Sequence, residues 1–231
     1  GIRIISLPRA VNRIHRMTKI VMHSYYVARS INADIYHFHE PELIPVGLLL
    51  KRLGKPVIFD SHEDLPKQLL SKPYLEPISL KILSSFFSLF ESVACKHLDG
   101  IIAATPFIRD KFLNINPRTV DINNYPLIGE LDSAISWNEK CDEVSYVGGI
   151  SSIRGIVEVV RSLEFVKTAA RLNLAGKFTE PAVETQVKTL YGWGRVNELG
   201  FLDRASVREV LGRSVAGLVT FHSKPNHTDA Q

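Results

Sequence analysis

The chain has 231 residues, of which 45% are hydrophobic, and its 28 basic and 24 acidic side chains give a net charge of +4. This length allows one large domain or two smaller ones, and the apolar fraction suffices for a folded core. Basic and acidic residues are interspersed along the chain, so we expect no nucleic acid as a partner. The two widely spaced cysteines, Cys95 and Cys141, are predicted to be free thiols in a reducing compartment.

No secretory signal and no run of about 18 apolar residues is visible, so we predict a cytoplasmic protein without a membrane-spanning segment. The chain begins at Gly1 directly in an apolar run and ends abruptly at Gln231. We therefore expect it to be part of a longer protein, with residues missing at both ends.

Apolar residues in the first half alternate between short runs, typical of strands, and helical spacing. Strands are predicted over residues 2–7, 34–39, 56–60, 100–104 and 120–123. Helices are predicted over residues 17–31, 43–53, 80–98 and 107–113. In the helix over 80–98 one apolar stripe is expected, formed by Leu83, Phe86, Phe87, Phe90, Val93 and Ala94.

A second alternating series follows residues 127–142, whose mixed charge and weak periodicity indicate a linker. Its predicted strands are 144–147, 170–175, 196–199 and 217–221, and its predicted helices are 156–163, 181–190 and 206–213. Asp203 is a candidate N-cap of the last helix. The fold class is therefore α/β, with two Rossmann-like domains over 1–126 and 143–231, each a parallel sheet covered on both faces.

Ligands of open parallel sheets bind at the carboxyl ends of the strands. One predicted strand of the first half ends in His39 and Glu40, and the next strand ends in a segment that contains His62, Glu63 and Asp64. The recurrence of His-Glu after two neighbouring strands predicts that these five side chains face one crevice.

A metal site is one interpretation of the histidines, because His37 and His39 share a strand face and a His-x-His pair can chelate Zn²⁺, with His62 as a third ligand. The other interpretation places His37 in the core of a strand buried on both faces. We favour the second and predict no metal ligands, with His39 as the functional histidine.

In the second half, VGGISSIRG at 147–155 joins a predicted strand to a helix. Gly148 and Gly149 would let the backbone approach a phosphate, and the helix N-terminus would offer free N–H donors. Arg154 could add a charge-assisted contact. A tight turn with a surface arginine is the alternative, since the segment matches neither the Walker A nor the G-x-G-x-x-G pattern.

Taken together, the two halves resemble glycosyltransferases of family 4, which have the two-domain GT-B fold. ADIYHFHEPELIPVGLLLKRLGKPVIFDSHED at 33–64 is similar to the acceptor-side unit of that family, and VSYVGGISSIRGIVEVV at 144–160 to the start of its donor domain. LNLAGKF at 172–178 and VNELGFLDRASVREVLGRSVAGLVTF at 196–221 are similar to the next blocks.

The resemblance implies transfer of a sugar from a nucleotide-sugar co-substrate to a glycan or lipid-linked acceptor, with retention of configuration and without a metal or other cofactor. It places His39 near the donor sugar as the catalytic residue and Arg154 on the donor diphosphate, beside Gly148 and Gly149. Many relatives carry a second arginine where this chain has Gly149, so one phosphate contact would be absent or supplied elsewhere. Glu40, His62, Glu63 and Asp64 would line the acceptor side.

The donor-binding motif of the family, two glutamates separated by seven residues, would follow Phe221 beyond Gln231, and its first strand and glycine loop would precede Gly1. We therefore expect the 231-residue chain itself to be inactive. A GT-B-fold sugar-nucleotide epimerase and a non-catalytic GT-B module are the competing interpretations. The sequence does not specify the sugar, the nucleotide base, the acceptor or the oligomeric state.

The region 66–98 combines basic and aromatic side chains, namely Lys67, Lys72, Lys81 and Lys96 with Phe86, Phe87 and Phe90. An amphipathic basic helix can lie on an anionic membrane. This makes peripheral contact with the inner face of the membrane a candidate role, against the alternative that the phenylalanines pack on the sheet.

Overall fold

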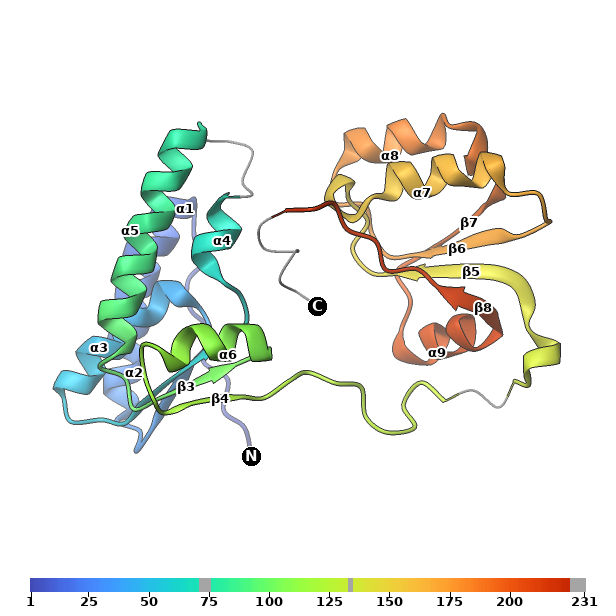
Figure 1. Cartoon of the computed structure of the whole chain (residues 1–231). Coiled ribbons are helices and arrows are strands. Elements are labelled where there is room, and N and C mark those ends of the chain that lie inside the picture. The colour runs from blue at the N-terminus through green and yellow to red at the C-terminus, as the bar shows by residue number, and fades with distance from the viewer. Residues whose placement is uncertain (71–75, 133–134, 225–231) are drawn as a thin grey trace. The chain divides into compact units, whose positions relative to one another are not determined.

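The computed structural model describes residues 1–70, 76–132 and 135–224. The chain divides into two compact units, residues 1–124 together with 224–231 (unit 1) and residues 125–223 (unit 2). Each unit contains, among its described residues, one four-stranded parallel sheet with interleaved helices (Figure 1). The predicted fold class, α/β with two Rossmann-like domains, is confirmed.

In unit 1 a helical region starts at Arg13, and alternating strands and helices follow it. Its elements are α1 (Arg13–His15), η1 (Arg16–Ile20), α2 (Val21–Ile31), β1 (Tyr36–Phe38), η2 (Pro41–Leu43), α3 (Ile44–Arg52), β2 (Val57–Ser61), α4 (Leu65–Leu70), α5 (Pro77–Cys95), β3 (Gly100–Ala103), α6 (Pro106–Leu113) and β4 (Thr119–Asp121). Local signals set the ends: Asn32 closes α2 in the left-handed conformation, and the Thr105 hydroxyl caps α6 by accepting from the Ile108 N–H.

The strands of unit 1 lie in chain order, β1-β2-β3-β4. Each crossover is right-handed and leads to the next strand on the same side of the sheet order. The connecting helices therefore all lie on one face of the sheet. That face holds the core, whose buried residues are Val21, Ile44, Val46, Leu50, Val57, Phe59, Ala94, Cys95, Leu98, Ile101, Ala103, Ile108 and Phe112.

Among the described residues no helix covers the second face of this sheet, contrary to the expectation of a sheet covered on both faces. Its side chains are exposed or half-buried, namely His37, Ile58, Asp60, Ile102 and Val120. The prediction that His37 is a core residue is therefore wrong, because strand alternation turns it away from the buried Phe59 face. Two of the side chains on this face, His37 and Asp60, are polar, which suits contact with water.

The apolar run at 2–7 forms no strand, contrary to prediction, and its Ile2 and Ile4 side chains are 95% and 86% exposed. A strand exists through its ladder hydrogen bonds, and this run is not paired with any strand that the structure describes. The apolar pattern of residues 2–7 therefore predicted a strand that is not formed.

Helix α5 packs one side on the core and presents the other to solvent. Leu80, Ala94 and Cys95 are buried, whereas Phe86 and Val93 are exposed, so the predicted single stripe is divided between the two sides. Among the described helices α5 is the one long and apolar enough to cross a membrane, a test that a packed core helix also passes.

Burial and an ion-pair network fix the inner side of α5. The carboxylate of Glu91 is buried and pairs with Lys111 of α6, which also pairs with Asp64. Burial raises the pKa of Glu91, although Lys111 opposes the rise. Burial also raises the pKa of the neighbouring Cys95 thiol to about 12. Both cysteines are free thiols, as predicted, with Cys95 buried and Cys141 exposed.

Unit 2 has the strand order β7-β6-β5-β8. Its elements are η3 (Trp137–Glu139), β5 (Cys141–Val147), η4 (Ser152–Arg154), α7 (Ile156–Ser162), η5 (Leu163–Phe165), β6 (Arg171–Ala175), α8 (Pro181–Lys188), η6 (Tyr191–Arg195), β7 (Val196–Gly200), α9 (Arg204–Arg213) and β8 (Ser214–Gly217). Because the chain reverses its direction after β7, α7 and α8 cover one face of the sheet and α9 the other (Figure 1). Asp203 caps α9 as predicted, accepting from the Ser206 N–H at 2.8 Å.

The last strand of unit 2 occupies 214–217 instead of the predicted 217–221. Pairing with β5 starts as soon as α9 ends, with Ser214 opposite Cys141, and the buried hydroxyls of Ser145 and Ser214 bond to each other at 2.5 Å. The apolar run that was predicted as a strand continues beyond the ladder, and its Val219 is exposed. The strand was predicted from a run of apolar residues, and a buried pair of serines does not belong to such a run. This explains why the predicted strand started three residues too late.

Candidate functional site

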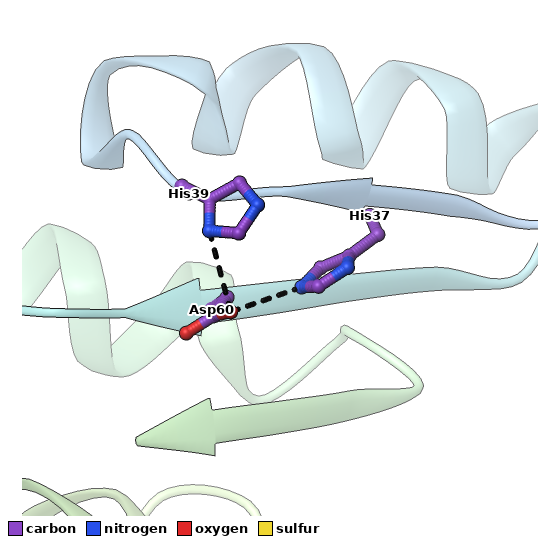
Figure 2. A group of neighbouring side chains, drawn as sticks. All are labelled: His37, His39 and Asp60. Carbon is purple, nitrogen blue, oxygen red and sulfur yellow. Dashed lines mark ion pairs between the residues drawn. The ribbon is translucent and has the colours of Figure 1, made fainter. Parts of the chain in front are cut away.

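Four polar side chains meet on the open face of the unit 1 sheet, at the carboxyl ends of β1 and β2. His37 and His39 are two residues apart, so both point to the same face. The register pairs His37 with Ile58, which brings Asp60, two residues further along β2, beside His39. Figure 2 shows both imidazoles turned toward the Asp60 carboxylate. His62 lies two residues after Asp60 and also contacts its carboxylate.

The Asp60 carboxylate is the centre of this cluster. Its Oδ2 lies 3.3 Å from His37 Nε2 and 3.3 Å from His39 Nδ1, and its Oδ1 lies 3.3 Å from His62 Nε2. His39 Nδ1 and His62 Nε2 are 3.1 Å apart. The Asp60 side chain is 13% exposed, against 42%, 57% and 55% for His37, His39 and His62. A mostly buried carboxylate thus holds three accessible imidazoles, an arrangement suited to proton transfer or to metal coordination.

A pocket of about 340 Å³ opens beside the cluster. It is lined by Arg16, His39, Glu40, Pro41, Glu42, Phe59, Ser61, His62, Glu63, Leu65 and Gln68. Four of the five residues predicted for the crevice, His39, Glu40, His62 and Glu63, therefore line one pocket, as the recurrence of His-Glu indicated.

Asp64 does not line this pocket. Its side chain is 11% exposed and accepts a 3.0 Å hydrogen bond from Lys111 Nζ. Its backbone carbonyl accepts from the Gln68 N–H at 2.8 Å, at the start of α4. In this arrangement Asp64 joins α4 to α5 and α6 through Lys111.

Arg16 and Asp60 were not among the predicted site residues. Arg16 reaches the pocket from η1, where its Nε lies 2.5 Å from Glu42 Oε1 and a second nitrogen lies 3.5 Å from Glu40 Oε2. The hydrogen bond to Glu42 raises the pKa of Arg16. No local pattern connects Arg16 to these glutamates. Asp60 had a signal, the Asp-x-His spacing to His62 at a strand end.

The glycine turn of unit 2 is built for close approach of backbone to backbone. The Gly148 N–H donates to the Ala175 carbonyl at 3.0 Å, and Gly176 has φ +144°. A Cβ on Gly176 would lie 1.8 Å from the Gly148 carbonyl oxygen, so only glycine fits. The Tyr146 hydroxyl donates to the Gly149 carbonyl at 2.8 Å, and burial raises the pKa of Tyr146 although Arg154 opposes the rise.

Gly148 and Gly149 line a second pocket, of about 390 Å³, at the carboxyl ends of the unit 2 strands. The other lining residues are Val147, Ala175, Gly176, Lys177, Thr179, Phe201, Leu202 and Val207. Arg154 is not among them: its guanidinium lies 4.2 Å from the centre of the Phe221 ring, and its carbonyl accepts from the Thr220 hydroxyl at 2.6 Å. Lys177 is a cation of this pocket that was not among the predicted site residues, although the segment 172–178 that contains it resembles a family block.

Comparison with known proteins identifies the chain. Residues 2–122, just over half of it, match the family described as Glycosyltransferase Family 4. The chain belongs to glycosyltransferase family 4. No curated protein sequence matches this family 4 chain.

Solved structures show the same two-domain GT-B fold. Sucrose-phosphate synthase from Thermosynechococcus elongatus superposes with a TM-score of 0.66 at 15% identity, over 93% of this chain and 58% of the synthase. Anabaena Alr3699/HepE in complex with UDP and glucose gives 0.64 at 14% identity, over 93% of this chain and 59% of that protein. UDP-N-acetylglucosamine 2-epimerase from Rickettsia bellii gives 0.53 at 9% identity, over 90% and 57%. The family 4 chain thus spans less than two thirds of these proteins.

Proposed function

We propose that the whole protein transfers a sugar from a nucleotide-sugar donor to a glycan or lipid-linked acceptor, with retention of configuration. The observation that carries this proposal is the pocket at the ends of β1 and β2, where His39, Glu40, His62 and Glu63 gather in a family 4 chain. In the reaction the acceptor hydroxyl oxygen bonds to the anomeric carbon. The bond from that carbon to the diphosphate breaks, and the departing diphosphate takes the electron pair and the acceptor proton.

The proposed roles follow from position and charge. His39, held by Asp60, acts as the catalytic residue, and Glu40, His62 and Glu63 orient acceptor hydroxyls. The donor is a nucleoside diphosphate sugar, the class of ligand held by HepE in its complex with UDP-glucose. It lies against the Gly148–Gly149 turn, where the exposed Arg154 stabilises the negative charge of the leaving diphosphate. With that charge stabilised by protein groups, the transfer requires no metal or other cofactor.

A thermal-shift screen of nucleoside diphosphates and their sugars on the full-length protein tests this function. A ligand that binds only the native state raises the melting temperature. We expect at least one nucleoside diphosphate to do so, and we expect Arg154→Ala to remove most of that rise. Arg161→Ala is the matched control, because Arg161 is also an exposed arginine of unit 2. An equal rise in Arg154→Ala and wild type would show the donor-site assignment to be wrong.

Sugar-nucleotide epimerisation is the second candidate, favoured by the fold shared with the Rickettsia bellii epimerase at a TM-score of 0.53. The two reactions differ in their need for an acceptor. Incubation of the full-length protein with UDP-N-acetylglucosamine alone would yield the C2 epimer only in an epimerase. The family match favours transfer.

We also propose that unit 1 lies on the cytoplasmic face of an anionic membrane through the outer side of α5. Five apolar side chains spaced along this side are exposed, namely Ile78, Ile82, Phe86, Leu89 and Val93. Lys81 and Lys96, both exposed, supply positive charge near the two ends of the stripe. An apolar stripe flanked by lysines fits an anionic lipid surface, where a lipid-linked acceptor would be found. Lys72 of the predicted basic region lies outside the described residues.

A further inference from the structure

We propose that His37, His39, Asp60 and His62 form a binding site for a divalent transition-metal ion, with Zn²⁺ as its probe. The site goes beyond the proposed transfer reaction, which uses no metal. Imidazole nitrogens and a carboxylate oxygen are the ligands that Zn²⁺ takes in proteins, commonly three or four of them with water in any open position. We call these four residues the histidine cluster.

The distances within the histidine cluster match a metal coordination shell. Around a tetrahedral Zn²⁺ with metal–nitrogen bonds of about 2.0 to 2.1 Å, neighbouring ligand atoms lie about 3.3 to 3.4 Å apart. The contacts of Asp60 with His37, His39 and His62 are each 3.3 Å, and His39 Nδ1 lies 3.1 Å from His62 Nε2. The ligand atoms of His37, His39 and Asp60 all lie within 4.8 Å of one another. These three ligand atoms are therefore close enough to share one ion, and His62 is placed to join them through its contacts with Asp60 and His39.

The same contacts are poor as hydrogen bonds. Protein N–H···O bonds are about 2.9 Å long, so the 3.3 Å contacts with Asp60 are long for this purpose. Two imidazole nitrogens 3.1 Å apart bond to each other only if one carries the proton and the other its lone pair. A metal ion removes this requirement, since it binds the lone pairs of both neutral rings.

Charge and access also suit a cation. One carboxylate among three neutral imidazoles leaves part of the metal charge uncompensated, and Glu63 of the adjoining pocket offsets part of the remainder. Arg16, the cation of this pocket, is held by Glu42 and Glu40. The imidazoles are roughly half exposed on the open face of the sheet, so an ion and a coordinated water can enter from solvent.

Metal binding would engage His39 Nδ1, the atom that contacts Asp60. An occupied histidine cluster could therefore not use His39 in transfer, and we expect Zn²⁺ to inhibit the proposed reaction. The binding test below does not depend on that reaction, so failure of either proposal leaves the other open to its own test.

The test is a titration of tag-free, metal-free full-length protein with Zn²⁺ by calorimetry, followed by Co²⁺ absorption spectroscopy. We expect one ion per chain and visible Co²⁺ bands at the intensity of a four- or five-coordinate site. His37→Ala, His62→Ala and Asp60→Asn should each weaken binding by about tenfold or more, since loss of even an outer partner costs 10- to 100-fold. His97→Ala is the matched control, because His97 is also an exposed histidine of unit 1.

Circular dichroism would reveal a variant that fails to fold. In that case the Co²⁺ spectrum of the wild type still tests whether the protein binds a metal ion. Absence of stoichiometric Zn²⁺ binding by the wild type would overturn the proposal. Unchanged affinity in folded His37→Ala and His62→Ala variants, or an equal loss in His97→Ala, would do so as well.

Discussion

At the scale of single residues, the contact between Gly176 and Gly148 sets how closely β5 and β6 approach at their ends. We predict that Gly176→Ala destabilises unit 2 by more than about 3 kcal/mol, because a side chain there combines a strained backbone with a collision against a backbone oxygen. Urea unfolding of the variant measures this loss. Gly194→Ala is the control, since Gly194 has open space around it and no positive φ, and it should change stability little. Equal stabilities would contradict the assigned constraint.

A second residue-scale prediction concerns Asp99, which joins α3 to the start of β2. Burial would raise the pKa of Asp99, but hydrogen bonds from Lys51 and the Val57 N–H outweigh it, so the pKa is lowered. A lowered carboxyl pKa contributes stability above the unfolded value of about 3.9, and this stability is lost as the pH falls through the folded value.

We therefore expect Asp99→Asn to cost about 1 kcal/mol at pH 7, a partly exposed charge-assisted bond being weaker than a buried one. The difference from wild type should shrink in urea unfolding experiments below about pH 4, where the wild-type carboxylate also becomes protonated. Asp142→Asn, at an exposed aspartate, should change little at either pH. A difference for Asp99→Asn that is independent of pH would contradict the ionic role.

The residues of the candidate site show what sequence patterns can predict. His39 and His62 lie together because the ends of neighbouring parallel strands meet at one edge, a rule that needs only the strand positions. His37 was misplaced because the pattern gave no sign that the second face of the sheet is open. Arg16 could not have been predicted, since its partner Glu42 lies 26 residues away and pairs with it only through the tertiary fold.

At the scale of elements, α5 carries a prediction about membranes. We expect the full-length protein to bind liposomes that contain anionic lipid, and we expect the double variant Phe86→Ser and Leu89→Ser to lose this binding. Both side chains are exposed, so the fold should be retained. Cosedimentation with liposomes measures the change.

Neutralising Lys81 and Lys96 to Gln separates the charge contribution from the apolar one. Each lysine near an anionic surface contributes about 1 kcal/mol, so this variant should bind anionic liposomes more weakly and neutral liposomes as before. Full binding by the Phe86→Ser and Leu89→Ser variant would show that α5 is not the membrane contact.

The elements were predicted best where the apolar periodicity was strong. They were predicted worst where the element depends on pairing with another strand. Most predicted strands and helices are present because their apolar runs and caps, such as Asp203, act locally. The run at 2–7 and the strand at 214–217 were misassigned because strand pairing depends on a partner. For the second of these, the partner is β5, whose Ser145 hydroxyl bonds to the hydroxyl of Ser214.

At the scale of the whole molecule, the alternation of strands and helices was enough to predict two parallel α/β units, since few arrangements bury such strands. The same alternation did not reveal that the sheet of unit 1 has helices on one face only among the described residues. That difference depends on the direction of successive crossovers, which the pattern does not encode. It is the difference that leaves His37 accessible, at 42% exposure, beside the mostly buried Asp60.

Strand order also has a consequence for how the two units form as the polypeptide is made. In unit 1 every strand pairs with the strand just before it, so its sheet can grow one crossover at a time from β1 to β4. In unit 2, β8 returns past β6 and β7 to pair with β5, and the sheet stays incomplete until residues 214–217 have left the ribosome. Such non-local pairings form slowly, because loop closure must precede the contacts that stabilise them. We expect unit 1 to become resistant to protease during synthesis well before unit 2, and pulse proteolysis of stalled chains would measure the order.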